Sequence, residues 1–157
     1  MTERAKLKTH WTILKYDEHG NLIETLEFEG NILLNAGITE LWNLVCGVGS
    51  PRAFNSTNAR VFVGDGTITP SPEQNRLQGT NIASRPVDSG YPMVSGKTAI
   101  WQATFGPDEA NFTWNEAGVA NGPNPPTDGV LLNRTVATMG TKQQGSTWIL
   151  QVRIEAS

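Results

Sequence analysis

The clearest structural pattern in the sequence lies in Thr147-Trp148-Ile149-Leu150-Gln151-Val152-Arg153-Ile154-Glu155. Its apolar residues at every second position are Trp148, Leu150, Val152 and Ile154. A period of two places successive side chains on opposite faces of a β-strand. The remaining positions include Gln151, Arg153 and Glu155, which suit a solvated face. The stretch is therefore predicted to be an antiparallel strand with one buried face.

Strand patterns recur along the chain and are separated by turn signals. Further strands are predicted at residues 7–16, 22–28, 59–64, 98–105, 112–119 and 130–139. The separators are a hairpin turn at 17–21, where Gly20 can adopt a positive φ, a loop with three prolines at 121–129 and a polar turn at 140–146. Pro86, Gly90 and Pro92 argue against a regular central strand in the segment 82–94.

One segment has the period of a helix. Ile38, Leu41, Trp42 and Val45 follow the i, i+3, i+4, i+7 spacing that makes a single apolar stripe, and Gly47 ends it. We expect one short helix over 38–45 that packs this stripe on a β core. A further helical turn is predicted at 72–77, because proline is tolerated at the first position of a helix.

These elements predict a fold class. Seven or eight strands with turns between them and one helix are typical of an all-β protein, an antiparallel β-sandwich that is jelly-roll-like, with one short helix and long loops. The length of 157 residues suits a single domain over 1–157, and residues 1–8 are expected to form an N-terminal arm.

Composition excludes several classes of function. Charged residues make up only 17% of the chain, so its modest hydrophobic content does not indicate disorder. The net charge is −3 and no segment gathers lysine and arginine, which argues against nucleic-acid binding. No apolar run reaches the ~20 residues of a membrane span, and no signal peptide is visible at the N-terminus. Synthesis in a cytoplasm is expected.

Catalytic and metal-binding patterns are sparse. Cys46 lies in an apolar run and is expected to be a buried structural thiol, and the two histidines, His10 and His19, lie in separate stretches. Asp65 in Gly64-Asp65-Gly66 lacks the spacing of a calcium loop and is predicted to form a tight turn. We therefore expect no catalytic residue, no metal, no cofactor and no enzymatic activity.

Glu116 is the one carboxylate that stands inside an apolar strand pattern. It is expected to be half-buried and hydrogen-bonded to a neighbouring loop. As a glycosidase acid it would need a second carboxylate at a defined distance. The tryptophans could stack on sugars, but core packing explains their positions better: Trp11, Trp42, Trp101, Trp114 and Trp148. A carbohydrate-binding β-sandwich is therefore an alternative from another functional class.

Six stretches carry a resemblance that spans most of the chain. They are GNILLNAGI (30–38), RVFVGDGT (60–67), QNRLQG (74–79), ANFTWNEAGV (110–119), VLLNR (130–134) and residues 140–148. In this order they resemble small tailed-bacteriophage proteins of the virion, decoration or tail type. The segment 114–119 is also similar to an element of phage tail-fibre and baseplate domains. None of the stretches is a catalytic signature.

The resemblance implies a structural protein of a tailed-phage virion. The favoured function is a capsid decoration or cement protein that stabilises the head by loop contacts, and the alternative is a tail, baseplate or short-fibre component. The implied partners are copies of the chain itself, as a trimer or other cyclic oligomer, and the major capsid protein or tail proteins. The implied location is the virion.

Long polar loops are expected to carry the contacts of such a protein. They lie at 47–58, 65–94 and 121–129. Phe54, Tyr91 and Met93 are apolar residues within these loops, and they are the candidate interface residues. The other interpretation is that these side chains tuck the loops onto the core.

Overall fold

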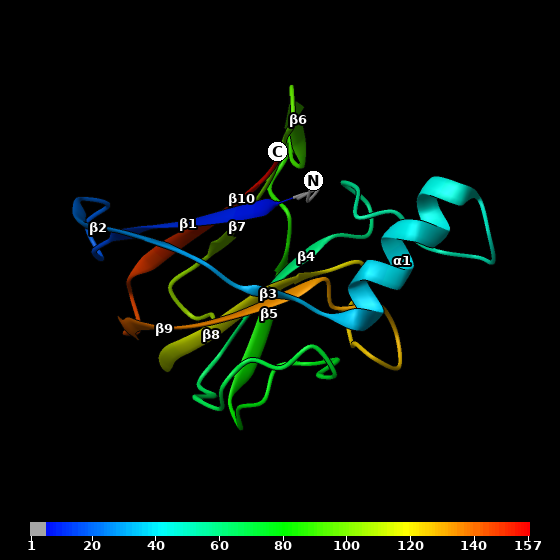
Figure 1. Ribbon diagram of the computed structural model, residues 1–157. Coiled ribbons are helices and arrows are strands. Elements are labelled where there is room, and N and C mark those ends of the chain that lie inside the picture. Colours follow the sequence, from blue (N-terminus) through cyan, green and yellow to red (C-terminus); the bar gives the residue numbers. More distant parts are fainter. Residues whose placement is uncertain (1–5) are drawn as a thin grey trace.

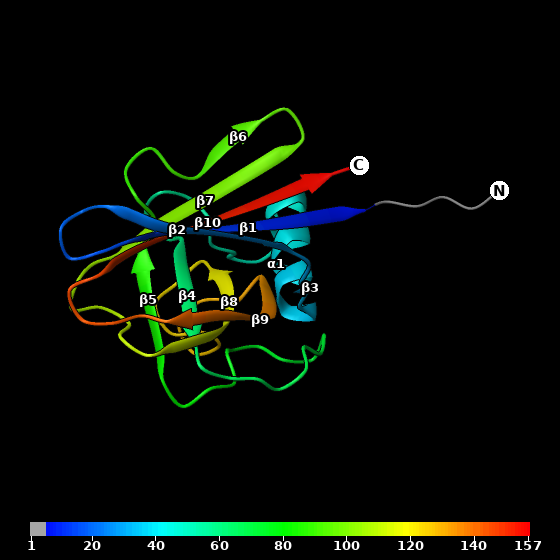
Figure 2. The ribbon, with the colours of Figure 1, turned by 90° about the vertical axis from the view of Figure 1, so that its left-hand side faces the viewer.

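Two antiparallel sheets lie one above the other in the computed structural model, which describes residues 6–157 (Figures 1 and 2). The first sheet has the order β2-β1-β10-β7-β6, with β1 (Leu7–Tyr16), β2 (Leu22–Glu29), β6 (Met93–Ser95), β7 (Thr98–Phe105) and β10 (Thr147–Ala156). The second has the order β3-β9-β8-β4-β5, with β3 (Ile32–Leu33), β4 (Arg60–Gly64), β5 (Ile82–Pro86), β8 (Thr113–Ala120) and β9 (Asn133–Thr141). The predicted β-sandwich is confirmed.

The strand with the clearest alternation holds the centre of its sheet. β10 pairs with β1 on one side and with β7 on the other, so that Val152 lies opposite both Trp11 and Trp101. All four apolar residues predicted for the inner face of β10 are buried. The pattern of period two therefore identified the strand that joins the N-terminal hairpin to the rest of the first sheet.

Aromatic rings from both sheets meet in the core between the layers. Trp114 of β8 makes edge contacts with Phe105 at 4.9 Å and with Trp148 at 4.8 Å between ring centroids. The ammonium group of Lys15 lies 4.3 Å from the centroid of the Trp148 ring and donates to the Met139 carbonyl at 2.6 Å. The buried Lys15 side chain thus packs against the aromatic core while its ammonium group keeps a hydrogen-bond acceptor.

A second, smaller apolar cluster lies outside the second sheet. It consists of Leu34, Phe62, Leu77, Ala120 and Leu131. Because Val61 and Val63 point into the main core, Phe62 between them must point to the other face of β4. The outer face of this sheet is therefore covered by chain, including part of the loop 65–81.

Three expectations about the strands need correction. The structure has ten strands within residues 6–157 because β3, β5 and β6 are edge strands of only two to five residues, too short for an alternation to be recognised. β9 runs from Asn133 through Thr141, so the predicted turn at 140–146 starts later. Residues 72–77 form no helix, and only turns and bends lie there.

Of the predicted N-terminal arm at 1–8, the structure describes residues 6–8. Leu7 and Lys8 belong to β1, where they pair with Ala156 and Glu155, so this part is strand and not arm. The reason is that β10 extends far enough to offer them hydrogen-bonding partners. Residues 1–5 lie outside the described residues. Lys6 and Ser157 exchange two backbone hydrogen bonds, which brings both ends of the described chain side by side.

The helix is confirmed, but the face that it presents to the core is not the predicted one. α1 (Asn35–Cys46) projects at one side of the sandwich (Figure 1) and ends at Gly47 in the left-handed conformation. Leu41 and Leu44 pack against the core, whereas Trp42 and Val45 of the predicted stripe are exposed. Nowhere in residues 6–157 is there a helix with the length and apolar character needed to cross a membrane.

Candidate functional site

Glu116 is the most constrained of the residues singled out from the sequence. Its side chain is completely buried rather than half-buried, and one carboxylate oxygen accepts from the backbone N–H groups of Gly66 at 2.9 Å and Gly79 at 2.7 Å. The other oxygen accepts from the Gln78 N–H and from Nε of Arg134, both at 2.8 Å. The predicted bond to a neighbouring loop is confirmed. Both oxygens are held by donors of the protein and the side chain is fully buried, so Glu116 does not reach a substrate as an acid catalyst would have to.

The glycines around this carboxylate explain why loop 65–81 can close over it. A Cβ built on Gly64 or Gly66 would lie 2.5 Å from Oε2 of Glu116, so only glycine leaves room for the acid. Arg134 is also fully buried, and its Nη1 donates to the Ile68 carbonyl at 2.7 Å. The pair therefore fastens the loop to β8 and β9, which is a structural role.

Asp65 also acts inside the protein. Its Oδ1 accepts from the backbone N–H groups of Thr80 at 2.9 Å and Asn81 at 3.1 Å, and its Oδ2 accepts from the Asn81 side chain. The bond from the Asn81 side chain is the main reason that the pKa of Asp65 is lowered, and these two N–H groups lower it further. Asp65 thus closes the base of loop 65–81 instead of forming a tight turn.

The remaining polar candidates do not converge on one site. His10 lies on the outer face of the first sheet, with Glu27 and Glu29 3.6 and 3.7 Å away, while His19 lies in an exposed turn. Cys46 is exposed and not buried as predicted, because it lies on the outward-facing side of α1, at the end of the helix. Residues 6–157 contain no cluster of three or more His, Cys, Asp or Glu side chains that could hold a metal ion.

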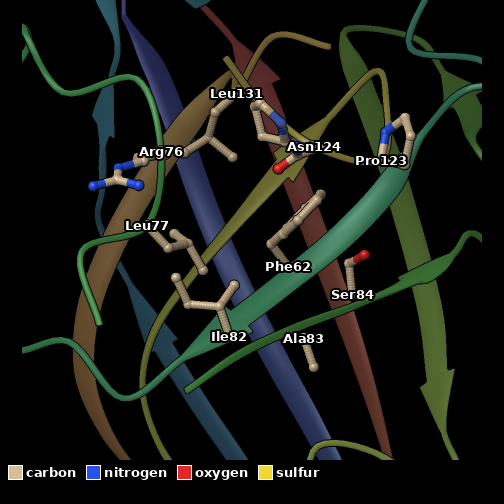
Figure 3. Close-up of a pocket in the computed structure, with 10 residues that line it drawn as sticks. Phe62, Arg76, Leu77, Ile82, Ala83, Ser84, Pro123, Asn124 and Leu131 are labelled. Carbon is tan, nitrogen blue, oxygen red and sulfur yellow. The ribbon is translucent and has the colours of Figure 1, made fainter. Parts of the chain in front are cut away.

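A small hollow lies over the outer face of the second sheet. It has a volume of about 310 Å³ and is bounded by β4, β5 and the loops 65–81 and 121–129. Figure 3 shows Leu77, Ile82 and Leu131 around Phe62, while the guanidinium group of Arg76 points away from the ring. Binding pockets combine an apolar lining with polar groups that converge on the ligand. Arg76, the one charged side chain that lines this hollow, does not point into it, so the hollow lacks this feature of a binding pocket.

A larger apolar groove runs between α1 and the ends of β1 and β10. Its volume is about 840 Å³, and it continues into a second hollow of about 300 Å³ that reaches β6. We call it the α1 groove and define it by its main lining residues: Leu7, Leu33, Ile38, Leu41, Trp42, Val45, Val94 and Ile154. The strands β1, β3, β6, β7 and β10 and the helix contribute to it, so it exists only in the folded protein.

Large apolar side chains around the α1 groove are exposed to solvent. Trp42 is 62% exposed, Val45 is 76% exposed and Val94, across the groove, is 79% exposed. The exposed residues of α1 carry no charge: Asn35, Ala36, Ile38, Thr39, Trp42, Val45 and Cys46. A solvated helix ordinarily shows a charged outer face. A contiguous apolar surface of this kind makes the α1 groove the candidate functional site of the described residues.

The three candidate interface residues have different surroundings. Phe54 is buried in the main core, and its carbonyl accepts from Nε1 of Trp101 at 3.0 Å, so it tucks its loop onto the core. Tyr91 is half-buried. Met93 is about half exposed in β6, next to Val94 of the α1 groove. Of the three, Met93 is the residue beside the exposed apolar surface.

The sequence contained a signal for the α1 groove, but the apolar residues of α1 were assigned to packing on the core. Five large apolar residues lie within α1, at Ile38, Leu41, Trp42, Leu44 and Val45, and Glu40 is its one charged residue. One helix face against a sheet cannot bury all five. The excess indicates a second apolar face, which the structure leaves exposed at Trp42 and Val45. Leu7 and Val94 could not be found in this way, because only folding brings them to α1.

Comparison with known proteins adds no relative: no protein-family model, curated protein or solved structure matches the chain.

Proposed function

We propose that this chain is a structural subunit of a tailed-phage particle, which attaches to neighbouring protein subunits through the α1 groove. The observation that carries the proposal is the exposed, uncharged face of α1 together with the apolar hollow beside it. Burying apolar surface contributes about 25 cal/mol per Å², so this face provides the driving force for association. The resemblance of six stretches, in their order, to phage virion proteins is the reason for proposing a phage particle as the assembly.

The rigid surroundings of the groove support an interface role. α1 is held by Gly37, where a Cβ would come within 2.5 Å of the Leu132 carbonyl oxygen, and by Glu40, which accepts from the Asn121 side chain at 2.8 Å. A surface fixed in this way loses little conformational entropy when a partner binds. Attachment to the capsid head, as a decoration protein, is the favoured position, and attachment to the tail is the alternative.

The carbohydrate-binding alternative has fewer residues to rely on. Glu116 is enclosed by loop 65–81, and four of the five tryptophans are buried in the core. Trp42 alone is exposed, and the groove beside it is lined mainly by aliphatic side chains, with Lys6, Asn31 and Ser157 as its polar residues. The surroundings of Trp42 therefore favour protein contact over sugar contact.

The test is to locate the chain on purified particles with an antibody and gold labelling. Gold spread evenly over the heads is the expected result, and gold on the tail alone would move the proposal to the tail component. Particles without gold would overturn the virion function. The groove is tested by replacing the wild-type chain with the Trp42→Gln variant during infection. This substitution should abolish incorporation of the chain into the particles. Ile68→Gln is the matched control, since Ile68 is 57% exposed and lies outside the groove.

A further inference from the structure

The hairpin between β1 and β2 ends in a second exposed apolar feature. Leu22 and Ile23 are 52% and 63% exposed. Neighbouring residues of a strand point to opposite faces, so this end is apolar on both sides. Asp17, Glu18 and Glu24 lie around Ile23, with Lys15 as the basic partner of Glu24. His19 lies beside Glu18, at 3.4 Å from its carboxylate. We call Asp17–Glu24 the hairpin tip, an apolar wedge with an acidic border.

The α1 groove has the complementary character. Its lining is apolar, and the charged side chains among its lining residues are Lys6 and Lys97, both basic. Neither lysine forms an ion pair with another residue of the described range 6–157. An apolar wedge with acidic borders thus matches an apolar groove with basic borders in polarity and in sign of charge.

The two features cannot meet within one molecule. The hairpin tip and α1 lie at opposite ends of the sandwich (Figure 1), separated by the length of the β1–β2 ladder. The groove can therefore receive the tip of a second copy. Such a contact joins different surfaces of identical chains, and repeating it gives a closed ring or an open filament.

We propose that the α1 groove binds the hairpin tip of a second copy of this chain, head to tail. The inference rests on the proposed function, in which the groove is an assembly interface, and it specifies the partner at that interface. Leu22 and Ile23 enter the groove beside Trp42 and Val45, and Glu18 approaches the lysines at its border. A row of copies keeps one free tip and one free groove at its ends until a ring closes.

Complementation of two variants tests the head-to-tail arrangement by sedimentation velocity. Wild type is expected to form species larger than a dimer. The tip variant Leu22→Gln/Ile23→Gln and the groove variant Trp42→Gln/Val45→Gln should each associate more than about tenfold more weakly, as expected for the loss of interface anchors. Mixed together, they should form a 1:1 dimer that does not grow, because one intact tip meets one intact groove. Ile68→Gln should behave as wild type.

A cross-link tests the same contact when association is weak. Cys46 is the one cysteine of the chain and follows Trp42 by one helical turn, so it lies on the same side of α1. In the variant Ile23→Cys, mild oxidation should join the introduced thiol at the tip of one copy to Cys46 of the next and give a ladder of oligomers on a non-reducing gel. Wild type and Ile23→Cys/Cys46→Ser should give dimers at most.

Several results would overturn the inference. The first is a wild-type protein that stays monomeric together with an Ile23→Cys variant that gives no ladder. The others are a tip variant that associates as wild type does, and tip and groove variants that do not complement each other. If the chain is nevertheless found on particles and Trp42→Gln prevents its incorporation, the proposed function stands and the groove binds a different protein. The two proposals can therefore fail separately.

Discussion

Glu116 brings a charge into the interior with enough partners to hold it there. Isolated burial of a carboxylate is costly, and an ion pair alone often fails to offset the loss of hydration. Three backbone N–H groups and Arg134 share the charge here. Because the donors come from loop 65–81 and from β9, the acid turns a long polar loop into a fixed wall of the fold.

Removal of the basic partner should therefore destabilise the protein strongly. Arg134→Met leaves Glu116 buried with its charge uncompensated, and we expect a loss of about 3–5 kcal/mol in the free energy of unfolding. Arg85→Met is the matched control, because Arg85 pairs with Glu109 at the surface and should cost at most about 1 kcal/mol. Urea unfolding measures both. Equal losses in the two variants would contradict the role given to Glu116.

Asp65 should make stability depend on acid. Its pKa in the folded protein lies below the ordinary value of 3.8, mainly because of the bond from the Asn81 side chain. The folded state therefore binds this proton less readily than the unfolded state, and the stabilisation is complete above pH 3.8 and lost as the pH falls through the folded pKa. Urea unfolding over this range should show a shallower decline for Asp65→Asn than for wild type. Identical slopes would refute the assignment.

At the scale of elements, α1 has two sides with different surroundings. Leu41 and Leu44 contact the core, and Leu34, directly before the helix, is fully buried in the outer cluster. Trp42 and Val45 face outward and add little to the stability of the monomer. The helix is thus attached by its inner side and its beginning, which leaves the other side free for a partner.

Two substitutions in and beside α1 should separate folding from assembly. Leu34→Ala empties a fully buried position and should lower the free energy of unfolding by about 2–5 kcal/mol. Trp42→Gln changes an exposed position and should shift it by no more than about 0.5 kcal/mol. Thermal unfolding of both variants in dilute solution is the measurement. A large loss in Trp42→Gln would show that the tryptophan supports the monomer fold.

The whole molecule is joined by one main core. Residues of both sheets contribute to the same buried cluster, and the four buried tryptophans belong to β1, β7, β8 and β10. No part of the described chain has a large separate core, since the outer cluster consists of five buried residues on the back of β4, β8 and their loops. The two sheets therefore depend on each other for stability.

Unfolding should accordingly be a single cooperative transition. Tryptophan fluorescence reports on the core between the sheets, and far-ultraviolet circular dichroism reports on the strands. The two signals should give the same midpoint in urea. The groove variant Trp42→Gln/Val45→Gln is the suitable protein, because association would otherwise shift the midpoint with concentration. Separate midpoints would indicate that the sheets unfold independently.

The class of fold and most of the strands could be predicted from local sequence patterns alone. Alternation from Thr147 to Glu155 and from Thr98 to Phe105 fixes which side chains face inward, because the period of a strand is a local property. The same reasoning located the helix and the hairpin turn at Gly20. It missed the short edge strands, whose few residues carry no period and whose pairing depends on the neighbouring strand.

Tertiary structure decided the rest. Glu116 could be identified as unusual, but its complete burial depends on glycines distant in the sequence, such as Gly66, 50 residues away, that leave space for it. The stripe of α1 was visible in the sequence, yet which side meets the core is set by the close approach of Gly37 to Leu132. The α1 groove combines residues from both ends of the chain, because β1 and β10 pair at the centre of one sheet. Such long-range pairings have no signature in any local stretch of the sequence.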